Sequence, residues 1–183
     1  MKVLALVLPW LLLGPGAQAA EYRRVDLAGS YIHFTSRQMG VPVDGAFRSF
    51  DASLAFDPEA PAQARGQLRI QLSSIDTGNR EANEEVVGAQ WFDAKRHPDA
   101  QFEMRQIQPL GADRFQVSGV LSLKGSSQPM SFSTQLKTSG NQAVMEGSFV
   151  LKRLDFKVGE GLWGDVGVVA NEVTVLFHLL LAR

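Results

Sequence analysis

Apolar and polar residues alternate along most of this chain, and a period of two predicts half-buried β-strands. The longest example runs from Phe115 to Leu123, where every second residue is apolar or glycine. A second example closes the chain, with apolar residues at each odd position from Val173 to Leu181. The same alternation covers residues 31–35, 67–72, 102–105, 130–136 and 145–151.

Turn signals separate these runs and predict how they connect. Lys124-Gly125-Ser126-Ser127 and Ser139-Gly140-Asn141 are typical of tight hairpins, and Asp57-Pro58 marks a further turn. Consecutive hairpins predict an antiparallel meander of about eight strands. Closing it into a barrel would remove its exposed edges, so we expect an extended, lipocalin-like antiparallel barrel. A two-sheet sandwich is the alternative.

The segment of residues 73–93 interrupts this all-β pattern. It predicts a short helix over Arg80–Val87, with Thr77 or Asn79 as N-cap and Gly88 just after the helix. The helix has too few apolar residues to be stable alone, so it must dock on the barrel. We expect it to cover a barrel end or a cavity, held there by Val86, Val87, Trp91 and Phe92.

The first twenty residues predict a cleaved signal peptide. Lys2 supplies the positive start, Val3–Leu13 an apolar stretch, and Ala17-Gln18-Ala19 a small-residue cleavage site. A retained anchor is the alternative, but this stretch is shorter than the roughly 20 residues that span a bilayer. The chain has no cysteine, which excludes lipoprotein attachment and disulfides. We therefore expect residues 21–183 to form one exported, periplasmic domain.

Charge and motif content exclude several function classes. The chain has 18 basic and 19 acidic residues without a basic block, so binding to nucleic-acid phosphates is not expected. His33, His97 and His178 are not spaced as metal ligands, and there is no G-x-S-x-G nucleophile motif. We predict no metal, no cofactor and no catalytic residue. If the protein were an enzyme for an apolar substrate, Asp76, Asp155 and His97 would be the candidates.

Residues 159–164 match the dinucleotide-binding pattern G-x-G-x-x-G by sequence alone. That pattern binds phosphates only where a helix follows, whereas a glycine-broken, β-branched run follows here. We interpret Leu154–Val169 as a mobile loop over the barrel mouth, in which Trp163 either packs into the mouth or anchors the loop.

Eleven phenylalanines, most on the larger apolar faces, allow two interpretations of the interior. One is a solidly packed barrel, and the other is a lumen that holds one apolar ligand. Gly119, Gly147 and Ala46 favour the lumen, because they leave space on the inner faces. The candidate lumen residues are Phe34, Phe47, Trp91, Phe92, Phe102, Met104, Val117, Leu121, Phe132, Phe149, Phe156 and Phe177.

Several of these blocks, in this order, resemble the YceI-like family of periplasmic polyisoprenoid-binding proteins. The similarity is carried by residues 32–35, 39–50, 56–58, 74–79, 91–93, 98–102, 121–125 and 153–159. The chain departs from the family pattern in two places. Arg37-Gln38 stands where many members have Lys-His, and Ser126 replaces a common histidine or arginine. These departures concern contacts to a lipid head group more than the fold.

The resemblance implies a lipid-binding protein that transports, stores or sequesters a polyisoprenoid, either a polyprenyl phosphate or an isoprenoid quinone. It implies no enzymatic activity. A stress-related interaction module with a packed barrel stays open, and so does an enzyme for an apolar substrate. Transient contact with a membrane or membrane protein, and the choice between monomer and homodimer, are left open as well.

Overall fold

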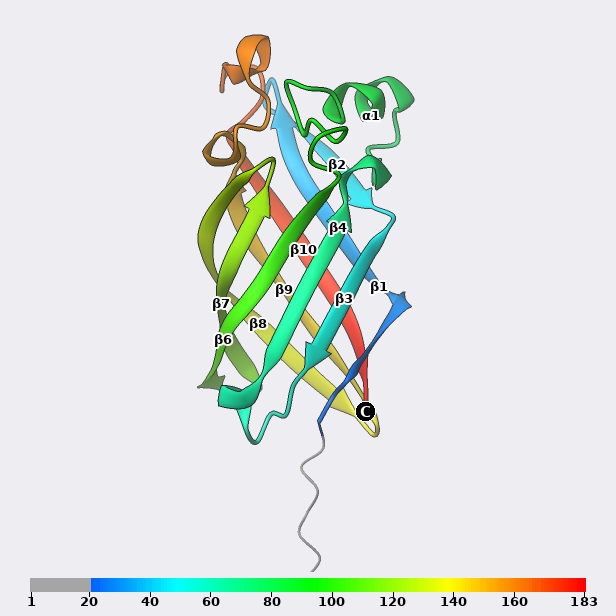
Figure 1. The fold of residues 1–183 in the computed structure, drawn as a ribbon, viewed down its shortest axis with the longest axis vertical. Helices are drawn as coiled ribbons and strands as arrows, with labels where there is room; N and C mark the ends of the chain where they lie inside the picture. Colours follow the sequence, from blue (N-terminus) through cyan, green and yellow to red (C-terminus); the bar gives the residue numbers. More distant parts are fainter. Residues whose placement is uncertain (1–20) are drawn as a thin grey trace, which may run out of the picture.

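A computed structural model describes residues 21–183, so the predicted signal peptide lies outside the described part. Ten antiparallel strands form one strongly curled sheet, a half-barrel whose strands run along the long axis of the molecule (Figure 1). The strands are β1 (Arg24–Gln38), β2 (Val41–Phe47), β3 (Phe50–Ala55), β4 (Arg65–Gln71), β5 (Ile75–Asp76), β6 (Asp99–Gly111), β7 (Arg114–Leu123), β8 (Ser126–Ser139), β9 (Gln142–Lys152) and β10 (Glu172–Ala182). The lipocalin-like antiparallel fold expected from the sequence is confirmed.

Two details of the sheet differ from the sequence prediction. There are ten strands rather than about eight, partly because β5 is a two-residue strand within the segment 73–93 that interrupts the alternating pattern. The hydrogen-bonded order runs β3-β4-β6-β7-β8-β9-β10-β1-β2-β5, so the sheet has two edges instead of a continuous ladder. Two backbone hydrogen bonds between Tyr22 and Phe56, of 2.8 and 3.0 Å, join the start of the described chain to the end of β3.

Three hairpins explain the strong twist of this sheet. The two-residue turns Met39-Gly40, Ala112-Asp113 and Lys124-Gly125 have positive φ at both residues. This is the geometry of type I′ turns, whose twist matches that of paired strands. The predicted hairpin at Lys124-Gly125 is therefore confirmed, and the one at Ser139-Gly140-Asn141 joins β8 to β9.

The inner glycines do not leave the free space that the sequence suggested. A Cβ at Gly147 would lie 2.8 Å from the Phe177 ring, and one at Gly119 would lie 2.5 Å from the Phe102 ring. At each glycine, the absence of a side chain lets an aromatic ring from the adjacent strand pack directly against the backbone. The empty space of this protein lies elsewhere.

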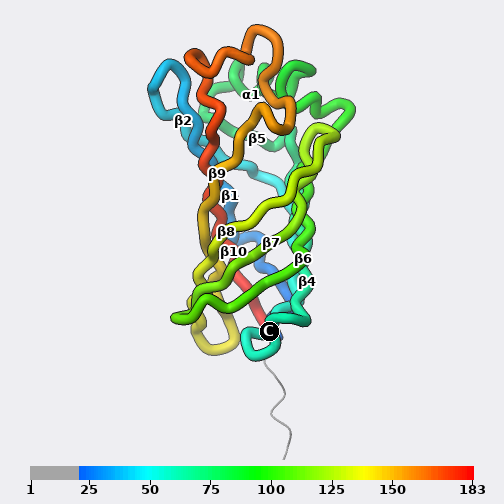
Figure 2. Tube along the Cα trace, turned by 90° about the vertical axis from the view of Figure 1, so that its left-hand side faces the viewer, coloured from blue at the N-terminus to red at the C-terminus, as the bar shows by residue number. Residues whose placement is uncertain are grey.

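Helix α1 (Arg80–Val86) and the loop between β9 and β10 lie at the same end of the sheet (Figures 1 and 2). Asn79, one of the two predicted N-caps, accepts a hydrogen bond of 2.9 Å from the backbone N–H of Ala82. Two short 3-10 turns, Arg153–Phe156 and Gly161–Gly164, shape the loop. Within residues 21–183, no helix has the length and apolar character needed to cross a membrane.

Candidate functional site

The concave side of the sheet encloses two apolar cavities. The upper cavity, of about 450 Å³, lies at the end that carries α1, and the lower cavity has about 110 Å³. The two are contiguous, since Ile32, Ile70, Ala100, Leu121, Phe149 and Val175 line both. Together they form an elongated apolar space along the long axis.

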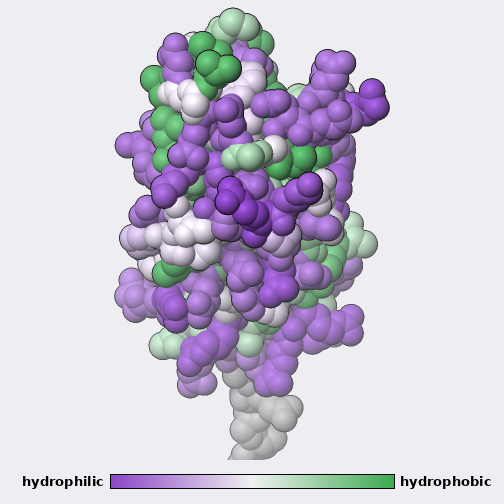
Figure 3. Space-filling view, turned by 45° about the horizontal axis from the view of Figure 1, so that its top comes forward, coloured by the Kyte–Doolittle hydropathy of each residue, from purple (hydrophilic) through white to green (hydrophobic). Residues whose placement is uncertain are grey.

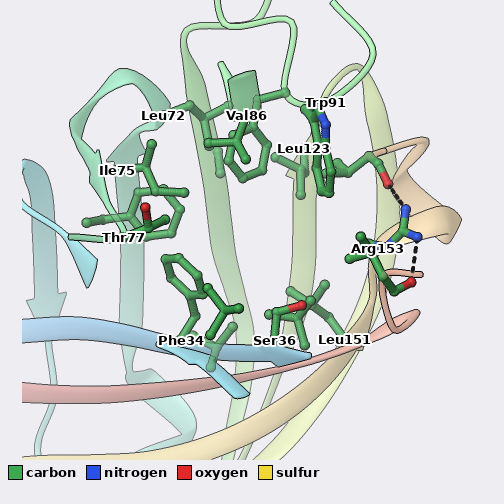
Figure 4. A pocket seen from close by; sticks show the side chains of 18 of the residues that line it. Phe34, Ser36, Leu72, Ile75, Thr77, Val86, Trp91, Leu123, Leu151 and Arg153 are labelled. Atoms are coloured by element: carbon green, nitrogen blue, oxygen red, sulfur yellow. Dashed lines mark hydrogen bonds between the residues drawn. The ribbon is translucent and has the colours of Figure 1, made fainter. Parts of the chain in front are cut away.

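Side chains from distant parts of the chain surround the upper cavity. Phe34 and Ser36 of β1, Leu151 of β9, and Ile75 and Leu72 before α1 point toward a common space (Figure 4). This arrangement follows from the strand period, because every second residue of β1 and β9 faces inward. The result is a wall of aliphatic and aromatic groups.

A hydrogen bond joins helix α1 to the β9–β10 loop across the end of the upper cavity that carries α1, which we call the mouth. The Nε1 of Trp163 donates to Oε1 of Glu85 at 2.9 Å, and both residues line the upper cavity. The Trp163 ring also packs against the Trp91 ring, with centroids 5.4 Å apart. Trp163 therefore lines the mouth and also anchors the loop, the two alternatives that the sequence left open.

Arg153 holds the loop together from beneath. Its side chain is only 2% exposed and forms five hydrogen bonds, all to backbone carbonyls. The acceptors are the carbonyls of Val158, Gly159, Trp163, Val169 and Ala170, at 2.7–3.0 Å (Figure 4 shows two of the five). Burial lowers the pKa of Arg153, but the guanidinium is so weakly acidic that it stays charged in a protein.

Aromatic rings divide the lower cavity from the packed end of the molecule. Phe132 stacks on Phe149 at 5.0 Å between centroids and contacts Phe102 and Phe177, each at 5.5 Å. Beyond these rings, a buried cluster that includes Tyr22, Phe56 and Phe115 closes the far end. Within residues 21–183, packed side chains thus close the far end of the apolar space, opposite the end that carries α1.

Most of the residues predicted for the lumen line these cavities. The upper cavity is lined by Phe34, Phe47, Trp91, Phe92, Leu121 and Phe149. The lower cavity is lined by Phe102, Met104, Val117, Phe132 and Phe177, and Leu121 and Phe149 line it as well. Phe156 lines neither cavity. It is 2% exposed and packs in a cluster with Leu72 and Val158, because the 3-10 turn at Arg153–Phe156 rotates it out of the strand pattern.

Several residues that surround the upper cavity were not predicted from the sequence. Val173 and Leu151 could have been found, since both belong to alternating runs whose other members were chosen. Thr77, Glu81 and Glu85 could not, because their position depends on how α1 folds back over the sheet.

The three candidates of the enzyme hypothesis do not converge. Asp76, Asp155 and His97 line neither of the two cavities. Asp76 has a structural role: a hydrogen bond from the Gly78 backbone N–H and another from Arg48 lower its pKa. Across residues 21–183, no three acidic or histidine side chains come close enough to hold a metal ion.

Known proteins share this sequence pattern and architecture. A family model described as the YceI-like domain matches residues 24–181. Among curated proteins, the chain is 30% identical to a UPF0312 protein of Azotobacter vinelandii over 96% of this chain and 94% of the relative. It is also 30% identical to a UPF0312 protein of Pseudomonas paraeruginosa, over 89% and 87% of the two chains.

Solved structures give similar matches. The crystal structure of BcnA from Burkholderia cenocepacia has a TM-score of 0.84 and 39% identity, over 86% of this chain and 99% of that one. A polyisoprenoid-binding domain from Saccharophagus degradans has a TM-score of 0.67 over 91% and 99% of the two chains. At 17% identity, the second match supports the fold alone.

Proposed function

The chain belongs to the YceI-like domain family, and we propose that it is a carrier that holds a polyisoprenoid chain in its two contiguous cavities. The observation that carries this proposal is the apolar space itself, which is long, closed at the end opposite α1 and lined almost wholly by hydrocarbon side chains. The name of the structural neighbour from Saccharophagus degradans, a polyisoprenoid-binding domain, is consistent with it.

The physical chemistry of such a ligand suits this space. Each buried methylene contributes roughly 0.8 kcal/mol, so a chain of isoprene units binds without specific polar contacts. A branched, flexible chain also follows a curved wall of Phe, Leu and Val side chains. The lower cavity would receive the tail, and the mouth beneath α1 would receive the head group, either a phosphate or a quinone ring.

We further propose that the protein works after export, in the periplasm, for transport, storage or sequestration of the lipid. The predicted signal peptide supports this setting. Because the carrier must collect its lipid from a bilayer, the α1 end would approach the membrane surface.

The surroundings of the mouth support that approach. Met39 and Leu162 are 73% and 89% exposed, and a backbone hydrogen bond of 2.8 Å from Met39 to Val168 joins their segments. Figure 3, with this end turned forward, shows hydrophobic groups among hydrophilic ones. Replacing Leu162 by Glu should slow lipid transfer from vesicles, whereas the same change at Leu110, which is 46% exposed on β6, should not.

Native mass spectrometry of the purified protein tests the carrier proposal. We expect an added mass that organic extraction releases as an isoprenoid. Val175 lines both cavities and Leu176, the next residue of β10, is exposed, so Val175→Trp should lose the lipid and Leu176→Trp should keep it. A lipid-free wild-type protein that also fails to take up added isoprenoids would overturn the proposal.

The packed-barrel alternative makes a different prediction for the inner rings. If Phe102, Phe132 and Phe149 were only core, replacing each by Ala should cost about 3–5 kcal/mol and change nothing else. As lumen residues, they should tolerate truncation better and lose ligand instead. Denaturant unfolding and isoprenoid titration of the same variants separate the two hypotheses.

A further inference from the structure

Among the described residues that line the upper cavity, Arg153 is the one cationic side chain. It has no free N–H donor for a ligand. A guanidinium has five N–H donors. All five donors of Arg153 are used by the five backbone carbonyls described above. A phosphate at the mouth could bind Arg153 only by breaking the bonds that hold the loop.

The other charged groups of the cavity wall are acidic. Glu81 and Glu85 lie one helical turn apart on α1, and both line the mouth. Glu85 accepts a hydrogen bond from Trp163, but a neutral indole leaves the charge of the carboxylate in place. A phosphate seated beneath α1 would therefore face two carboxylates of its own sign.

Two cations near this end of the molecule, Lys124 and Arg48, have partners of their own. Lys124 bonds to Glu160 at 3.1 Å and to the Lys157 carbonyl at 2.6 Å. Arg48 pairs with Asp76 at 2.8 Å. Neither Lys124 nor Arg48 lines the upper cavity, so neither offers a phosphate a site within it.

From this charge arrangement, and resting on the proposed function, we infer that the mouth selects isoprenoids with an uncharged head group, such as an alcohol or a quinone ring, over isoprenyl phosphates. The polar groups available there suit such a head group. Ser36 and Gln38 line the cavity with a neutral hydroxyl and a neutral amide, which can donate to a carbonyl oxygen or exchange hydrogen bonds with a hydroxyl. The Thr77 hydroxyl also lines the cavity, but it donates to Oδ1 of Asn83 at 2.8 Å and can only accept from a ligand.

Titration with two matched probes tests the inference. Geranylgeraniol and geranylgeranyl phosphate share one hydrocarbon chain and differ in head-group charge. At low ionic strength we expect the alcohol to bind at least about tenfold more tightly, because each like-charge contact at the mouth costs roughly fivefold in affinity. Added salt should reduce this ratio, since it screens exposed charges.

A double variant assigns the preference to α1. Glu81→Gln with Glu85→Gln removes both charges yet keeps an oxygen that can accept the Trp163 hydrogen bond, so the alcohol-to-phosphate ratio should fall several-fold. Glu84→Gln is the matched control, because Glu84 lies on the same helix outside the cavity lining and pairs loosely with Arg80. It should leave the ratio as it is.

The possible outcomes are distinguishable. A phosphate that binds as tightly as the alcohol would overturn the inference while leaving the carrier proposal standing. A ratio that neither salt nor the double variant changes would also overturn it. If neither probe binds, the proposed function itself fails.

Discussion

The indole of Trp163 and the carboxylate of Glu85 form a 2.9 Å hydrogen bond that spans the cavity mouth. It joins two segments that are 78 residues apart in the chain, the β9–β10 loop and helix α1. Under the carrier proposal, entry and exit of a long ligand at this end would require the two segments to separate, so we expect this bond to act as a latch.

Breaking the latch should speed ligand exchange. Trp163→Phe removes the donor but keeps an aromatic ring, and a rim hydrogen bond contributes about 1 kcal/mol, which corresponds to roughly fivefold in rate. Stopped-flow displacement of a fluorescent isoprenoid measures the rate. Val166→Ala, at an exposed position of the same loop outside the cavity lining, serves as the control. Equal rates in all three proteins would show that opening does not involve this bond.

Gly147→Ala should destabilise the protein, because a Cβ there would lie 2.7 Å from the Ser133 carbonyl oxygen and 2.8 Å from Phe177. Overpacking of this kind costs about 1–3 kcal/mol in the free energy of unfolding. Gly164→Ala is a matched control, since a Cβ at Gly164 would meet nothing within 4 Å. Urea unfolding compares the two, and equal midpoints would contradict the ring-over-glycine packing.

Arg153→Lys should weaken the loop strongly. Lysine has three donors, so at least two of the five carbonyls lose their partner, at a cost on the order of 2–5 kcal/mol. Arg105→Lys, at an exposed residue that pairs with Glu103, should change stability little. If both changes cost the same in denaturant unfolding, Arg153 does not anchor the loop.

Hydrogen exchange tests the mobility predicted for the loop Leu154–Val169. The amides of Val158 and Gly159 are bonded to Arg153 and Gln90 and should exchange slowly, whereas residues 161–167 should exchange faster than the strands. We therefore expect the mobile part of the loop to be shorter than the Leu154–Val169 segment predicted from the sequence. Protection of residues 161–167 equal to that of β7 and β8 would exclude a gate.

Acid should selectively weaken the junction between β2 and β5, where Asp76 bonds to Arg48 and to the Gly78 N–H. These bonds lower the pKa of Asp76 in the folded state. Its stabilising contribution is therefore present above the ordinary carboxyl pKa and is lost as the pH falls through the lower, folded value. The stability gap between wild type and Asp76→Asn should shrink over this acidic range. A constant gap down to pH ~2 would contradict the assignment.

The sequence predicted the strands and their inner faces because a period of two depends on local residue order alone. Phe132, Phe149 and Phe177 were assigned inward on that basis, and they do line a cavity. The size and place of the empty space could not be predicted, since they depend on register. Strand pairing places the Phe177 ring on Gly147. The space that the glycine was expected to leave free is therefore filled by this ring.

The loop was harder to predict for a related reason. Arg153 bonds to carbonyls up to 17 residues away, and no local pattern encodes that set of acceptors. Phe156 was predicted to line the lumen, but the turn that Arg153 begins directs it into a packed cluster. The conformation of this loop thus depends on long-range hydrogen bonds, which the periodicity of the sequence does not reveal.

The most direct test of the carrier account is a crystal structure of the protein with its co-purified or added isoprenoid alcohol. The account predicts one continuous ligand density, with the head group near Thr77 and Trp91 and the tail between Phe132 and Val175. Density on the outer surface alone, or cavities that hold only water while the ligand is bound elsewhere, would contradict it.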